Sequence, residues 1–197
     1  MTRLHSSIAF ALALSAALTA CQDERSPEPV MAPTFARSAN DVAPIDDQTQ
    51  LAELRRVTAK FHSIEAAKQA QYSTQITPCW AHHSAGAMGY HYGNTSLFDA
   101  TVDLLAPETV IYEPQAGGHM KLVGMEYIVP LDAWAAANHD LNDPNDVPQL
   151  LGQRFTRHSF LPIFKLHIWL WRNNPSGTFA DWNPKVSCQH AETTQTF

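Results

Sequence analysis

Three ionisable side chains stand out because they lie in segments that are otherwise apolar and rich in β-branched or aromatic residues. His167 lies within 164–171, and Glu113 and Glu126 lie in two further segments of this kind. A buried polar side chain needs a partner. A carboxylate beside an imidazole can hold a metal ion, work as an acid and base pair, or form a structural pair. These three alternatives stay open at this point.

A second concentration of reactive side chains lies between residues 77 and 101, which show no hydrophobic period. The chain has 10 histidines, and we take His82 and His91 in this segment, together with His167, as candidate metal or ligand contacts. Imidazole with carboxylate suits copper or zinc, although the spacing matches no established metal motif. We predict a long functional loop here. The alternative is that its histidines are hydrogen-bonded inside a loop that seals the core. The aromatic residues expected to line an adjoining pocket are Tyr90, Tyr92, Trp169 and Trp171.

The elements that must position these residues follow from hydrophobic periodicity. Apolar residues recur at steps of three and four from Leu51 to Ile64, which predicts an amphipathic helix over 48–74. The later predicted elements are a hairpin of 109–113 and 119–129 that turns at Gly117–Gly118, a short helix over 133–138, a strand over 164–171, a type I turn at 174–177 and a final strand carrying Val186 and Cys188. The acidic segment 140–146 lacks the glycine and closing glutamate of an EF-hand loop and predicts a solvated turn.

The strand over 164–171 predicts a sheet that is buried on both faces. Leu166, Ile168 and Leu170 point to one side, whereas His167 and two tryptophans point to the other. One long helix with a run of strands predicts an α+β fold, an N-terminal helix packed on a curved antiparallel sheet. This element order resembles the cone-shaped folds of the NTF2 and cystatin type. The resemblance implies a bent sheet that can enclose a pocket.

Composition limits the class of protein. The chain has 197 residues, of which 16% are charged and 45% hydrophobic, which predicts one globular domain over 47–197. Thirteen basic residues against nineteen acidic ones give a net charge of -6. This charge argues against nucleic acid as a partner. The apolar stretch over 6–20 is too short to span a bilayer.

The first twenty residues predict a secretion signal. Arg3 provides a positive start, an apolar run extends from Ile8 to Leu18, and small residues lead to Cys21. The tetrapeptide Leu18-Thr19-Ala20-Cys21 resembles the lipobox of bacterial lipoproteins. The resemblance implies cleavage before Cys21 and a diacylglycerol anchor on its sulfur. The alternative is a conventional secretory signal with a chance cysteine.

The residues after the cysteine refine this expectation. Gln22 occupies the position at which aspartate tends to retain lipoproteins at the inner membrane, so the resemblance implies the outer membrane, facing the periplasm or the cell exterior. Residues 21–46 contain four prolines and no hydrophobic period, which predicts a disordered tether. With Cys21 lipidated, Cys79 and Cys188 remain, and an oxidising compartment favours a disulfide between them. A reactive thiolate or a metal ligand is the alternative.

The predicted disulfide has a consequence for the site, because it fixes the 77–101 segment near the end of the chain. We therefore predict that His91 or His82 lies near His167, with Glu113 or Glu126 within reach. Three functions compete: a lipoprotein that binds a metal ion, one that binds a small ligand, and a hydrolase or lyase using His167 with Glu113. A purely structural envelope role is a fourth alternative. We expect a binding role.

Overall fold

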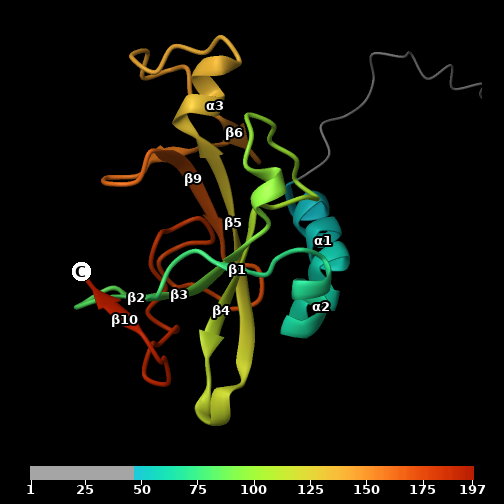
Figure 1. Cartoon of the computed structure of the whole chain (residues 1–197), viewed down its shortest axis with the longest axis vertical. Helices are drawn as coiled ribbons and strands as arrows, with labels where there is room; N and C mark the ends of the chain where they lie inside the picture. The colour runs from blue at the N-terminus through green and yellow to red at the C-terminus, as the bar shows by residue number, and fades with distance from the viewer. Residues whose placement is uncertain (1–46) are drawn as a thin grey trace, which may run out of the picture. The chain divides into compact units, whose positions relative to one another are not determined.

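The computed structural model describes residues 47–197 (Figure 1). The predicted signal peptide over 1–20, the lipidation site Cys21 and the predicted tether over 21–46 lie outside the described residues. Within the described part, no helix combines the length and the hydrophobicity needed to cross a membrane.

The N-terminal helical region is shorter than predicted and is broken once. Helix α1 spans Asp47–Thr58, the 3-10 helix η1 continues over Ala59–His62, and α2 spans Ile64–Gln69. The break lies at Ser63, whose backbone is extended and whose hydroxyl accepts a hydrogen bond from the Ala66 amide as an N-cap. The predicted helix over 48–74 is therefore correct at its start and wrong at its end.

The remaining elements form one curled sheet and one small hairpin. The strands are β1 (Thr74–Gln75), β2 (Cys79–His82), β3 (Gly86–Gly93), β4 (Thr109–Pro114), β5 (Met120–Pro130), β6 (Gln149–Leu150), β7 (Gln153–Arg154), β8 (Thr156–Arg157), β9 (Ile163–Ile168) and β10 (Thr194–Thr196), with short helices η2 (Thr95–Leu97), η3 (Ala116–Gly118) and α3 (Leu131–Ala136) between them. The strand order is β10-β2-β3-β4-β5-β9-β8, β1 also pairs with β3, and β6 pairs with β7 separately. All pairs are antiparallel except β10 with β2. The predicted hairpin of β4 and β5 is confirmed.

The prediction of a long loop over 77–101 is wrong, because strands β2 and β3 and helix η2 occupy most of this segment. Nearly all of β3 is buried, so polar and apolar residues do not alternate along it. Glycine in β3 marks close packing rather than a loop. A Cβ atom on Gly89, whose φ is +96°, would lie 2.5 Å from the Tyr112 carbonyl oxygen on β4.

Two strand predictions near the C-terminus also need correction. Strand β9 ends at Ile168, so the alternation does not extend to Trp171, whose ring packs against His62 on the helical side. The predicted final strand at Val186 and Cys188 is irregular, and β10 follows it instead. The physical reason is a turn at Asn183, whose side chain accepts a hydrogen bond from the Lys185 amide.

The predicted disulfide between Cys79 and Cys188 is confirmed, and it joins β2 to this irregular segment. The two cysteines are 109 residues apart in the sequence, and their Cα atoms are 5.8 Å apart. The bridge therefore holds the start of β2 against the chain that precedes β10.

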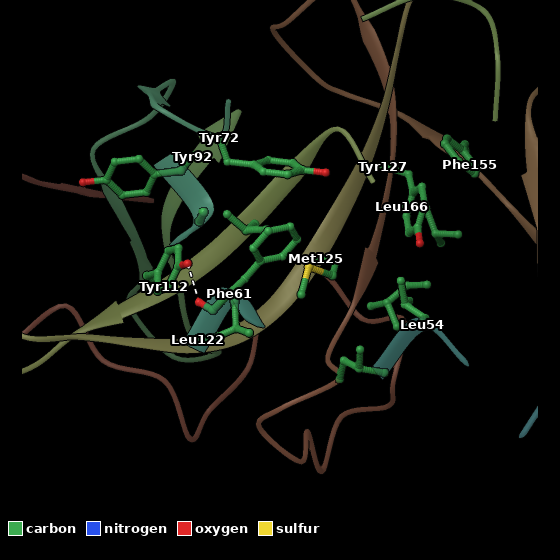
Figure 2. Close-up of a cluster of buried hydrophobic side chains, with 14 of the residues drawn as sticks. Leu54, Phe61, Tyr72, Tyr92, Tyr112, Leu122, Met125, Tyr127, Phe155 and Leu166 are labelled. Atoms are coloured by element: carbon green, nitrogen blue, oxygen red, sulfur yellow. Dashed lines mark hydrogen bonds between the residues drawn. The ribbon is translucent and has the colours of Figure 1, made fainter. Parts of the chain in front are cut away.

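The main hydrophobic core lies between the helices and one face of the sheet (Figure 2). Leu54 and Phe61 from the helical region pack with strand residues that include Met125 and Tyr127. Tyr112 donates a hydrogen bond from its hydroxyl to the Phe61 carbonyl oxygen, at 2.6 Å. The side chains on this face of the sheet thus pack directly against the N-terminal helical region.

The opposite face lies on the inside of the curl, because the two ends of the sheet meet across it. Trp80 on β2 contacts His158, which follows β8, with ring centroids 5.6 Å apart. Phe160 stacks on Phe197 beyond β10, at 5.7 Å. The fold is therefore α+β, with a helix packed on a strongly curled, mostly antiparallel half-barrel, as the sequence predicts.

Candidate metal centre

Three buried side chains from three strands converge on the inner face of the half-barrel. They are His91 on β3, Glu126 on β5 and His167 on β9, and their ligand atoms lie within 4.8 Å of one another. Glu126 and His167 are direct partners in the β5–β9 register. His91 is one strand further away, across β4, so the curl of the sheet is what lets it reach the other two. We call this group the inner triad.

The inner triad is compact enough to hold a metal ion. The two Nε2 atoms of His91 and His167 are 3.4 Å apart. Glu126 places one carboxylate oxygen 3.6 Å from His91 Nε2 and the other 3.4 Å from His167 Nε2. Tetrahedral ligands at bonds of ~2.0–2.1 Å lie about 3.3–3.4 Å apart, and octahedral ligands at the same bond length about 2.9 Å. The distance between the two Nε2 atoms agrees with the tetrahedral value, whereas the two contacts of Glu126 involve different oxygens of its carboxylate. With one ligand atom from each residue, the three atoms lie within 4.8 Å of one another.

Each imidazole also has a polar group on its outer side. His91 Nδ1 lies 2.9 Å from the Thr77 hydroxyl oxygen, and His167 Nδ1 lies 3.5 Å from the Asp181 carboxylate. Lys165 donates a hydrogen bond from its ammonium group to the same carboxylate. A proton on each Nδ1 leaves Nε2 as a lone pair aimed into the triad, which is the arrangement of a metal-binding histidine with its supporting carboxylate or hydroxyl.

Burial sets the protonation of the inner triad. Desolvation, together with the nearby His167 and Lys165, holds the pKa of His91 well below its usual value, so this imidazole is neutral and free to donate its lone pair. Desolvation also raises the pKa of Glu126, and His167 opposes this only in part. For Asp181, burial acts to raise the pKa, but the hydrogen bonds and the charge attraction of His167 and Lys165 together outweigh it and lower the pKa. Asp181 is thus a permanent anion behind His167.

Two cavities adjoin this region inside the curl, and Trp80 and His158 line both of them. The first, of about 270 Å³, includes Lys165 and Asp181 in its wall. The second, of about 210 Å³, is mainly apolar and includes Glu126. We call the second one the apolar cavity.

The other two candidate contacts lie elsewhere. His82 is at the end of β2, where its Nδ1 accepts hydrogen bonds from the Ser84 and Ala85 amides and caps a turn. Glu113 is buried on β4, where its carboxylate accepts a hydrogen bond from the Ser187 amide. The pairing of Glu113 with His167 therefore has no geometric support, because the carboxylates beside His167 are those of Glu126 and Asp181.

The four aromatic residues expected to line the pocket also lie elsewhere, because none of them is in the wall of either cavity. Tyr90 accepts hydrogen bonds at its hydroxyl from the Glu192 and Thr193 amides. Tyr92 and Trp171 pack against the main core. Trp169 stacks on His167, at 6.0 Å between ring centroids, and donates its indole N–H to the Ala180 carbonyl oxygen.

Sequence reasoning missed Thr77, Asp181 and Lys165 as supports of the inner triad. Lys165 could have been found, because it lies two residues before His167 and therefore shares its side of the strand. Asp181 lies in an irregular segment, and no sequence pattern indicates that it meets β9. The chain matches no protein-family model, no curated protein sequence and no solved structure.

Proposed function

We propose that this protein binds one zinc ion at the inner triad, through Nε2 of His91, Nε2 of His167 and the carboxylate of Glu126. The observation that carries the proposal is the set of three distances between these groups, 3.4, 3.4 and 3.6 Å, in a fully buried place. A buried carboxylate is costly to leave without a counter-charge. A divalent ion would supply that counter-charge and accept all three lone-pair groups.

Zinc fits better than the other divalent ions for two reasons. Magnesium and calcium prefer oxygen ligands in sites of six or more ligands, whereas this site offers two nitrogens. Copper(II) and nickel(II) favour square-planar or tetragonal sites, whereas zinc accepts two imidazoles and one carboxylate and leaves a fourth position open. Because copper(II) binds most nitrogen sites more tightly than zinc, competition in the test tube does not identify the native ion.

The decisive experiment is the metal content of untagged protein, isolated from its native source without chelators and analysed by elemental mass spectrometry. We expect about one zinc per chain. The substitution Glu126→Gln should remove most of this metal, because it takes away the anionic ligand and keeps the shape of the side chain.

A matched control is available on the same sheet. Glu113 and Glu126 are both 6% exposed, and Glu113→Gln keeps an acceptor for the Ser187 amide. This control should retain the metal, as should His82→Gln, whereas His167→Gln should lose it. A wild-type protein that neither carries nor takes up a divalent metal would refute the proposal, and so would equal metal loss in Glu113→Gln and Glu126→Gln.

We also propose that the chain is a lipoprotein of the outer membrane. The support is the sequence Leu18-Thr19-Ala20-Cys21 followed by Gln22. The substitution Cys21→Ser should move the protein from the membrane fraction to the soluble fraction, and Gln22→Asp should move it to the inner membrane. Membrane attachment that persists in Cys21→Ser would contradict lipidation.

A further inference from the structure

The apolar cavity is a pocket whose polar groups gather at the inner triad. Its apolar wall comes from β5, from the segment before β2 and from the chain that leads into β9. The lining residues are Ile76, Thr77, Trp80, Phe98, Glu126, Ile128, His158, Leu161, Pro162 and Ile163. As far as residues 47–197 show, this wall contains no lysine or arginine. His158 does not supply a cation readily either, since its Nδ1 accepts hydrogen bonds from the Phe160 and Leu161 amides.

The cavity reaches the triad through Glu126. Glu126 lines the cavity and also belongs to the triad. Thr77 lines the cavity as well, and its hydroxyl is hydrogen-bonded with Nδ1 of His91. The side chains of His91 and His167 are almost fully buried, so the carboxylate is where the triad opens toward the cavity. Three protein ligands leave the fourth tetrahedral position of a zinc ion for a water molecule or another ligand.

The charge around that position favours an anion. A divalent ion beside ionised Glu126 leaves one net positive charge. Lys165 and Asp181 form an ion pair and cancel each other. Both triad imidazoles are neutral when they ligate a metal. An anionic oxygen at the fourth position would therefore neutralise the site in a place with little water.

We propose that the apolar cavity binds a small monocarboxylate with one apolar ring or branched chain, whose carboxylate takes the fourth position on the metal. This inference rests on the proposed zinc site. The size supports it, because the cavity holds about 210 Å³. An apolar cavity of roughly 150 Å³ accepts benzene, so a single ring with its carboxylate fits.

Benzoate is a suitable probe, with benzamide as its neutral analogue and acetate as the head group alone. The full chain is first loaded with cobalt(II), whose visible absorption reports the ligands of the ion. Binding of each probe is then measured by calorimetry on zinc-loaded and metal-free protein. We expect benzoate to bind the zinc protein about tenfold or more tightly than benzamide, acetate, or benzoate with metal-free protein, and to change the cobalt spectrum.

Two exposed leucines provide a matched pair of variants. Leu161 lines the apolar cavity and is 36% exposed, whereas Leu105 is in the wall of neither cavity inside the curl and is 43% exposed. Because both side chains are accessible, each can be replaced by glutamate with little effect on the core. Leu161→Glu should weaken benzoate binding about tenfold or more by placing a like charge at the cavity wall. Leu105→Glu should leave it within about threefold.

The outcomes separate this inference from the zinc site itself. If the cobalt spectrum forms normally but benzoate leaves it unchanged, the ligand inference is wrong and the metal site stands. Equal benzoate binding with and without metal would also overturn the inference, as would equal effects of the two glutamate variants. If the triad takes up no metal, the proposed function fails first, and the inference fails with it.

Discussion

Glu108 allows a quantitative test of the structure, because it is a buried carboxyl that belongs to no ion pair among the described residues. It precedes β4, is 2% exposed, and accepts a hydrogen bond from the Ile128 amide at 3.0 Å. Desolvation raises its pKa to about 8, and the hydrogen bond from Ile128 offsets this only in part. The substitution Glu108→Gln keeps the size and the acceptor while removing the charge.

The raised pKa fixes the sign and the size of the effect. Below pH 4.5 the carboxyl is protonated in both the folded and the unfolded chain. Between pH 4.5 and about 8 the folded state holds one proton more than the unfolded state, so the free energy of unfolding falls as pH rises. A shift of about 3.5 units at 1.36 kcal/mol each amounts to roughly 3–5 kcal/mol lost across this window. The free energy of unfolding of Glu108→Gln should not show this fall, because the amide does not titrate.

Urea unfolding of wild type and Glu108→Gln, followed by circular dichroism from pH 4.5 to 8.5, measures the difference. Histidines titrate in both proteins, so their contribution cancels in the comparison. The stability of the variant relative to wild type should rise by roughly 3–5 kcal/mol from the acid to the alkaline end, and then level off. A stability difference that stays constant with pH, or falls as pH rises, would show that Glu108 is not the desolvated carboxyl that the structure describes.

Three further predictions follow from single contacts. Asp181→Asn should weaken zinc binding about 10–100-fold in a competition titration with a coloured chelator, because it removes the anion behind His167; unchanged affinity would mean that this carboxylate does not support the site. Replacing Cys79 and Cys188 by serine should lower the free energy of unfolding in urea by about 5 kcal/mol, since the bridge closes a loop with a separation of 109 residues; equal stability would contradict the entropic account. Gly89→Ala should destabilise the protein by about 2 kcal/mol or more in thermal unfolding, because its Cβ would lie 2.5 Å from a backbone oxygen of β4; a fully stable variant would mean that the strands can move apart there.

The fold was predictable where side chains alternate and unpredictable where they do not. In β9, Leu166 and Ile168 lie in the main core and His167 on the opposite face, as the period of two predicts. In β3, both faces are buried, and glycines interrupt the pattern. The residues of β3 therefore carry no amphipathic signature, although its pairing with β4 is regular from Tyr90 to Gly93.

The candidate site was predictable in part, for a topological reason. Tying 77–101 to the C-terminal region through the disulfide correctly indicated that His91 lies near His167. The choice between Glu113 and Glu126 depends on the register of β5 against β9, in which Glu126 faces His167 directly. A register is set by pairing along the whole strand and by the turns, so a local sequence window does not contain it.

The positions of the triad and its supports suggest how metal binding and folding are coupled. His91 and its partner Thr77 belong to the β2–β3 side of the half-barrel, and His167 belongs to the β9 side. A bound ion would connect the two sides directly, and its binding free energy would add to the stability of the fold. The disulfide starts only two residues beyond Thr77 and acts on the same edge by restricting the unfolded chain. Two independent effects would thus favour the closed half-barrel. The metal ion would stabilise the folded state, and the disulfide destabilises the unfolded state by restricting its chain.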